Sequence, residues 1–204
     1  MIVCHSRKFL FISNPKTGST SIEFALAACN DEPQLNEIFE NGLYTQNHMP
    51  AQFLKNMLSA DIWNDYFKFS FVRNPWDWFV SQHFYNLDKN GVAMDINARL
   101  RKRDILETYE FLKMYRGNRN AESAFQHSFL CNNKNEVLVD FVGRFERFRD
   151  DFQEIQNRIH TNSVLPHLNS SKHKDYRFYF NDESRSIIAE LYKVDIELFG
   201  YDFY

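Results

Sequence analysis

One arrangement occurs twice in this chain and limits what it can fold into: a short apolar run, a tight turn with proline, and then a helical pattern. The first copy is the run at residues 8–14, with a helical pattern from Ser19. The second copy is the run at residues 66–72, with a helical pattern over residues 76–87. Continuous apolar runs are typical of parallel strands that helices cover on both faces. The two copies therefore predict strand, loop and helix units of an α/β fold.

The rest of the chain fits the same architecture. The segment between the two copies includes a helical pattern at residues 51–58 and is long enough for a crossover between parallel strands. No linker or repeat divides the 204 residues, so we expect a single domain over residues 1–204. The predicted fold class is α/β, a three-layer sandwich with a central parallel sheet. The further predicted elements are a strand at residues 136–142 and helices at residues 96–115, 148–159 and 182–192.

Charge and cysteine content exclude several classes of protein. With 24 Lys and Arg against 27 Asp and Glu, the net charge is −3, so no general polyanion-binding surface and no nucleic-acid partner is expected. The three cysteines are far apart and form no C-x-x-C pair, which argues against a disulfide framework and suits a reducing compartment. No stretch approaches the roughly 20 apolar residues that span a bilayer. We therefore expect a cytoplasmic protein with no membrane partner.

The loop at residues 14–21, Asn-Pro-Lys-Thr-Gly-Ser-Thr-Ser, has the composition of an anion site. N–H groups at a helix start attract phosphate, a glycine lets the backbone approach closely, and Ser and Thr hydroxyls add donors. Lys16 supplies a positive charge. Because Lys16 precedes Gly18, whereas the Walker lysine follows its last glycine, an ordinary ATPase is disfavoured. The alternative interpretation is a well-capped turn with an exposed lysine.

A second candidate site follows the second apolar run. Arg73 lies at the predicted strand end, and Ser81 comes eight residues later, within the next helix. An arginine presents a planar fork to phosphate oxygens, and a serine adds a hydroxyl, so both side chains suit one phosphate group. The alternative is an arginine that forms an ion pair near a helix start.

Together the two segments resemble a known pair of motifs. Residues 15–21 resemble the 5′-phosphosulfate loop of sulfotransferases that use 3′-phosphoadenosine 5′-phosphosulfate (PAPS). Arg73-Asn-Pro-x5-Ser81 resembles their 3′-phosphate motif. The segments at residues 142–152 and 176–203 resemble the carbohydrate, or type 2, branch of the same family.

This resemblance implies a fold related to that of P-loop nucleotide kinases, with PAPS lying across the strand ends. It implies that Lys16 contacts the leaving phosphate, and that Arg73 and Ser81 hold the 3′-phosphate that distinguishes PAPS from ATP. The expected product is adenosine 3′,5′-bisphosphate. No histidine pair has the spacing of metal ligands, so no metal is expected to be required. The positions that would surround the 5′ end are Thr17, Gly18, Ser19, Thr20 and Ser21.

Sulfuryl transfer to a hydroxyl also needs a base, and a histidine with a pKa near 6.5 suits that task at neutral pH. His48 is the predicted base, because it lies in the polar loop between the two motifs, where this branch of sulfotransferases often carries one. The alternative role of His48 is to order that loop. His83 is more simply explained by packing and Glu23 by capping or an ion pair, while His167 and His173 are expected to be loop residues.

The sequence therefore predicts a PAPS-dependent sulfotransferase that acts on a hydroxyl, or less often an amine, of a carbohydrate or small-molecule acceptor such as a secondary metabolite. Two other functions stay open at this point. One is an atypical P-loop nucleotide kinase, which would prefer ATP with Mg²⁺. The other is a non-catalytic nucleotide-binding module, which would bind the bisphosphate without transferring sulfate.

Overall fold

Four strands form one sheet, in the order β1-β2-β3-β4. β2 (Phe9–Phe11) runs parallel to β3 (Phe67–Val72), and β3 runs parallel to β4 (Phe141–Arg144). β1 (Ile2–Cys4) pairs antiparallel with β2, and its three residues are too short for a periodic pattern to predict. The two predicted strands at the apolar runs are confirmed. The computed structural model of the chain describes residues 1–33, 48–90, 125–166, 168 and 173–204.

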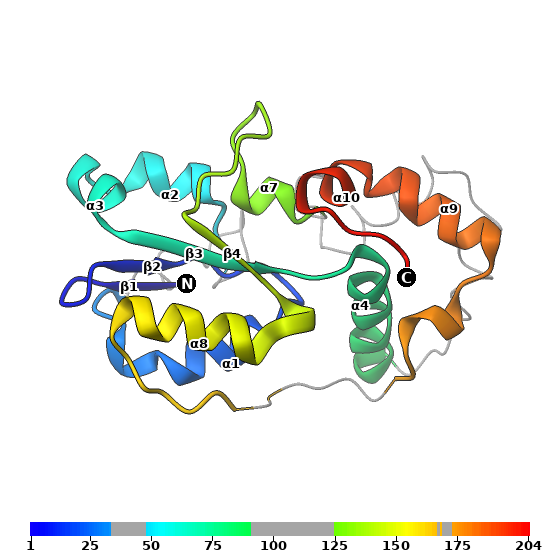
Figure 1. Cartoon of the computed structure of the whole chain (residues 1–204), viewed down its shortest axis with the longest axis horizontal. Helices are drawn as coiled ribbons and strands as arrows, with labels where there is room; N and C mark the ends of the chain where they lie inside the picture. The colour runs from blue at the N-terminus through cyan, green and yellow to red at the C-terminus, as the bar shows by residue number, and fades with distance from the viewer. Residues whose placement is uncertain (34–47, 91–124, 167, 169–172) are drawn as a thin grey trace. The chain divides into compact units, whose positions relative to one another are not determined.

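The described residues form two compact units, of which unit 1 (residues 1–72 and 126–169) contains the whole sheet. Helices cover both faces of this sheet, as Figure 1 shows, and the predicted three-layer α/β arrangement is confirmed. One face carries α1 (Ser19–Ala25) and α8 (Phe148–Ile159), and the other carries α2 (Ala51–Met57) and α3 (Ala60–Asp65). The remaining short helices of unit 1 are η1 (Ala27–Cys29), α7 (His127–Leu130) and η4 (Phe145–Arg147).

Aromatic side chains fill much of the interior of unit 1. Phe9 and Phe11 on β2 and Phe69 and Phe71 on β3 are fully buried, and the strand period of two places them on one face of the sheet. The rings of Phe11 and Phe69 lie 5.2 Å apart. Burying one such side chain stabilises the fold by about 1.5–3 kcal/mol. Their partners from the helices are Ile22, Leu26, Phe152, Ile155 and Ile159.

The strand predicted at residues 136–142 begins only at Phe141, so its first five residues were wrongly assigned. The physical reason is that the Asp140 carboxylate, and not a backbone carbonyl, accepts the hydrogen bond from β3 at this point. The Asp140 carboxylate accepts the Lys68 N–H at 2.7 Å and also pairs with the Lys68 ammonium at 2.9 Å. Before this point, Val137 forms one isolated bridge with Cys131.

Unit 2 (residues 73–125 and 170–204) is helical in its described part. α4 (Pro75–Asn90) begins at the proline of the second turn, and α9 (Asp182–Leu191) begins after a capping box between Asn181 and Ser184. Both predicted helices are confirmed, and η5 (Tyr176–Tyr179) and α10 (Lys193–Phe199) accompany them. The helix predicted at residues 96–115 lies outside the described residues. The core of unit 2 consists of Trp76, Trp78, Phe79, Val80, Ile188 and Tyr192.

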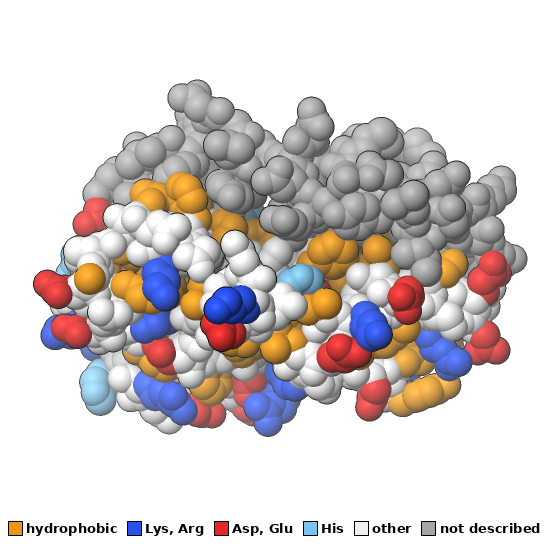
Figure 2. Space-filling model, turned by 90° about the horizontal axis from the view of Figure 1, so that it is seen from above, with side chains coloured by type: hydrophobic (Ala, Val, Ile, Leu, Met, Phe, Trp, Pro, Cys, Tyr) orange, Lys and Arg blue, Asp and Glu red, His pale blue; other side chains and the backbone are white. Residues whose placement is uncertain are grey.

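Two features of the described residues concern polyanion and membrane partners. On the face that Figure 2 shows, basic and acidic side chains are intermingled and form no extended patch of one sign. Among the helices of the described ranges, none has the length and apolar character needed to cross a membrane.

One exposed ion pair in unit 2 gives a direct pH prediction. Hydrogen bonds from the Arg177 guanidinium and backbone N–H lower the pKa of Asp175 to about 2. The stabilisation from this carboxylate is therefore present above its ordinary pKa of about 3.9 and is lost as the pH falls through about 2. We expect a ¹³C NMR titration of Asp175 to show this low midpoint in the native protein.

Arg177→Ala should return the Asp175 midpoint toward about 3.9. Arg158→Ala, which removes another exposed Arg–carboxylate pair in unit 1, serves as the control and should leave the Asp175 midpoint unchanged. A native midpoint near 4 would contradict the assigned hydrogen bonds.

Candidate functional site

The loop between β2 and α1 is a tight turn that contains two residues of positive φ. Lys16 and Gly18 both adopt the left-handed conformation, with φ of 62° and 81°. Turns of this kind direct N–H groups into a concavity that attracts anions. The buried Thr17 hydroxyl donates to the Asn14 carbonyl at 2.8 Å and holds the turn closed. This part of unit 1 therefore forms the tight loop between a strand and a helix that the sequence predicted.

The same loop rests on a ring from the hydrophobic core. A Cβ atom added to Gly18 would lie 2.7 Å from the ring of Phe148, the first residue of α8. Phe148 in turn packs edge to face against Phe71 of β3, with ring centroids 5.2 Å apart. Gly18 is thus required twice, once for its positive φ and once for the close approach of the ring.

The hydroxyl residues after Gly18 differ in exposure. Thr20 is exposed, whereas Ser19 and Ser21 are buried. The Ser21 hydroxyl oxygen accepts the Leu168 N–H at 3.1 Å and so ties the segment after α8 to the first turn of α1. α1 has only seven residues, so its macrodipole adds little, and Lys16 is the main positive charge of the loop.

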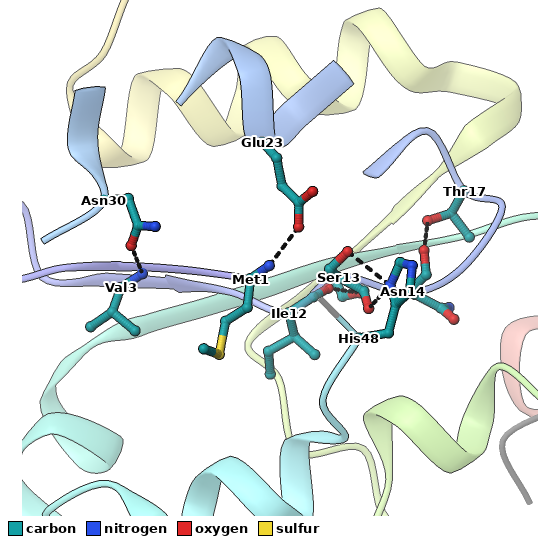
Figure 3. A network of polar contacts seen from close by, with 10 residues as sticks. Met1, Val3, Ile12, Ser13, Asn14, Thr17, Glu23, Asn30 and His48 are labelled. Carbon is teal, nitrogen blue, oxygen red and sulfur yellow. Dashed lines mark hydrogen bonds and ion pairs between the residues drawn. The ribbon is translucent and has the colours of Figure 1, made fainter. Parts of the chain in front are cut away.

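The His48 side chain comes from another segment of the chain and lies beside Ser13, directly before this loop. Its Nδ1 atom is 3.0 Å from the Ser13 hydroxyl and 2.9 Å from the Ser13 carbonyl oxygen (Figure 3). Ser13 is fully buried and comes three residues before Lys16. The structure thus brings the predicted base into the same part of unit 1 as the predicted anion loop.

The second candidate segment belongs to unit 2. The Arg73 Nε–H donates to the Asp77 carboxylate at 2.8 Å, and both side chains are largely buried. The structure therefore contains the ion pair that the alternative interpretation of Arg73 predicted. Asn74 directly precedes α4, where its Oδ1 accepts the Trp76 N–H, and its Nδ2 donates to the Asp202 carbonyl. Ser81 is buried on the same helix.

The other candidate bases have the contacts of structural residues. His83 is buried edge to face against Phe84, and His173 stacks on Phe84 with ring centroids 5.6 Å apart. Glu23 accepts a hydrogen bond from the Met1 nitrogen at 2.5 Å (Figure 3). His167 lies outside the described residues. Within the described ranges, no group of three or more His, Cys, Asp or Glu side chains has the arrangement of a metal site.

Comparison with known proteins decides the family. The model of the sulfotransferase family, in its type 2 branch, matches residues 1–202 of the chain. The chain belongs to this family. An uncharacterized protein of Archaeoglobus fulgidus is 25% identical to this sulfotransferase-family chain over 132 residues, which is 63% of the chain and 98% of the archaeal protein. No solved structure matches the chain.

Two residues of the candidate site had no role in the sequence prediction. Ser13 is a polar residue near the end of the first apolar run, directly before the loop, and that position was the one available signal. Phe148 had no such signal, since its contact with Gly18 joins positions 130 residues apart.

The Phe148 contact predicts the effect of Gly18→Ala on this sulfotransferase. A Cβ atom in the left-handed region costs about 1–2 kcal/mol, and overpacking against a ring adds about 1–3 kcal/mol. We expect the variant to be less stable than wild type by about 2–5 kcal/mol in urea unfolding.

A second substitution separates the two causes. In a Phe148→Leu background the ring is absent, so Gly18→Ala should cost only the backbone share, about 1–2 kcal/mol. Equal costs in both backgrounds would mean that the ring does not limit the residue at position 18.

Proposed function

We propose that this chain transfers a sulfuryl group from PAPS to a hydroxyl, or less often an amine, of a carbohydrate or small-molecule acceptor. The observation that carries the proposal is the Lys16 loop in its left-handed turn, with His48 held against Ser13 at the start of that loop. Membership of the sulfotransferase family over residues 1–202 supports PAPS as the donor. That family match runs through both compact units, and we propose that they act as one sulfotransferase domain.

The groups at the loop suit a phosphosulfate. Lys16 provides a cation, and the turn at residues 16–18 provides backbone N–H groups, so the donor set is that of an anion site. When bound, PAPS supplies the sulfuryl group and a phosphate leaving group. Lys16 stabilises the negative charge that develops on that phosphate, and such fixed donors act most strongly where charge appears in the transition state. The proposed 5′-binding positions are Lys16, Thr17, Gly18, Ser19, Thr20 and Ser21.

Arg73 and Ser81 of unit 2 are the proposed 3′-phosphate ligands. The Arg73 Nε–H is engaged by Asp77, and this ion pair fixes the plane of the guanidinium. A guanidinium with a fixed plane binds phosphate oxygens at a lower entropic cost than a mobile one. The Asp77 contact is thus compatible with a ligand role and orients Arg73 for it.

His48 is the proposed base. As the acceptor oxygen forms its bond to sulfur, the bond between sulfur and the phosphate oxygen breaks, and its electron pair stays on the phosphate. The acceptor proton moves to the His48 imidazole. Positioned bases of this kind contribute about 10²- to 10⁴-fold to rates.

The site is proposed to work without a metal ion, since Lys16 and Arg73 supply positive charge of their own. We therefore expect the same initial rate of sulfuryl transfer with and without EDTA.

Thermal unfolding with adenosine 3′,5′-bisphosphate tests the donor assignment first. At 100 times its Kd the ligand adds about 2.7 kcal/mol, which raises the Tm of a chain of this size by about 5 to 11 °C. ATP with Mg²⁺ should give a smaller shift. Equal shifts with both ligands would favour a nucleotide kinase, and a bisphosphate shift without transfer of labelled sulfate to any acceptor would favour a binding module.

A further inference from the structure

The His48 imidazole meets two oxygen atoms of a single residue. Its Nδ1 atom lies 2.9 Å from the Ser13 carbonyl oxygen and 3.0 Å from the Ser13 hydroxyl oxygen, as Figure 3 shows. A neutral imidazole carries its proton on one nitrogen and a lone pair on the other, and the hydrogen bonds around the ring select between these tautomers.

The carbonyl oxygen decides the tautomer. A carbonyl only accepts hydrogen bonds, so a contact of 2.9 Å with Nδ1 requires that Nδ1 carries the proton. The Ser13 hydroxyl oxygen can accept from the same N–H, so the two contacts agree with one assignment. With the proton on Nδ1, the lone pair of His48 is on Nε2.

The residue that makes both contacts is firmly held. Ser13 is fully buried and directly follows Ile12, whose N–H donates to the Phe69 carbonyl at 3.0 Å. The Ile12 carbonyl accepts from the buried Ser70 hydroxyl at 2.6 Å. These two hydrogen bonds to β3 therefore fix the backbone directly before Ser13, the residue that carries both oxygen atoms.

We propose that Ser13 is a positioning residue that holds His48 in the Nδ1–H tautomer, with Nε2 presented as the proton acceptor. The inference rests on the proposed role of His48 as the base. When Nε2 takes the proton of the acceptor hydroxyl, the imidazole becomes a cation and both Nδ1 contacts become charge-assisted, which strengthens them. Ser13 thus orients the ring before transfer and stabilises it afterwards.

¹⁵N NMR of histidine-labelled protein tests this inference without an activity assay. At a pH where His48 is neutral, we expect Nδ1 to give the signal of a protonated nitrogen and Nε2 that of a nitrogen with a lone pair. The His48→Asn variant assigns the signals by removing them. A wild-type spectrum with the proton on Nε2 would overturn the proposal.

Ser13→Ala keeps the carbonyl and removes the hydroxyl oxygen. We expect it to raise the Nε2–H population of His48 and to lower kcat by about 2- to 10-fold, since one net hydrogen bond contributes about 0.5–1.5 kcal/mol. Ser184→Ala also removes a hydrogen-bonded buried hydroxyl, in the capping box of α9, and should leave the His48 signals unchanged. Unchanged signals and unchanged kcat in Ser13→Ala would refute the positioning role.

His48→Asn separates this inference from the proposed function. The asparagine amide can still donate to the Ser13 carbonyl but offers no atom in place of Nε2, so we expect wild-type Tm and loss of turnover. If His48→Asn remains active while the wild-type tautomer is Nδ1–H, the assignment of the base fails and the Ser13 contact stands.

Discussion

Lys16→Ala is expected to lower kcat for sulfuryl transfer by about 10²- to 10³-fold, the usual effect of removing one preorganised donor from a developing oxyanion. The free energy of unfolding should stay close to that of wild type. Lys16 has a φ of 62°, and alanine keeps the Cβ atom that makes this conformation unfavourable, so the backbone strain is unchanged. Glycine at this position would relieve the strain and confuse the comparison.

Lys8→Ala is the matched control for this substitution. Lys8 is also a lysine of unit 1 with a positive φ, 51°, and it lies at the other end of β2. Steady-state kinetics and urea unfolding of both variants should show a loss of kcat for Lys16→Ala alone. Equal kcat values for the two variants would remove Lys16 from the proposed mechanism.

Arg73→Ala is expected to affect both stability and ligand choice. The Asp77 carboxylate is 16% exposed and loses its partner, and an uncompensated buried charge of this kind costs about 3–5 kcal/mol. The variant should also bind adenosine 3′,5′-bisphosphate and adenosine 5′-monophosphate with similar Kd values, because the 3′-phosphate has lost its proposed ligand. Urea unfolding and calorimetric titration measure the two effects.

Two further variants separate stability from recognition. The double variant Arg73→Ala/Asp77→Ala removes the unpaired carboxylate, so we expect it to regain stability without regaining the preference for the bisphosphate. Arg147→Ala removes another Arg–Asp pair with the same spacing, in which Asp151 is buried, and it should leave that preference intact. A bisphosphate preference that persists in Arg73→Ala would show that Arg73 is only a structural ion pair.

The sequence predicted those elements whose own pattern decides their structure. The helix at residues 148–159 has the bounds that its apolar periodicity indicated, and the buried runs formed β2 and β3. The strand at residues 136–142 was placed too early, because the ladder contact there is made by the Asp140 side chain. No local pattern reports such a contact between distant segments.

The same distinction applies to the candidate site. The loop composition predicted the turn around Gly18, since glycine and small hydroxyl residues act locally. The contact partners of the proposed functional side chains were harder to predict from the sequence. Asp77 is four residues from Arg73 and was within reach of a helical-spacing argument, whereas Ser13 and His48 are 35 residues apart and meet only in the folded chain.

The ring beneath Gly18 links the evolution of the loop to that of the core. A larger residue at position 18 needs a smaller side chain at position 148, and a smaller side chain there leaves space beside Phe71 that another residue must fill. Single changes at these three positions are therefore disfavoured, and compensated changes remove the cost of the ring contact but not that of the positive φ at position 18. We expect relatives of this chain to vary at positions 18, 71 and 148 as a group, so that covariation among them would mark sequences that keep the same loop.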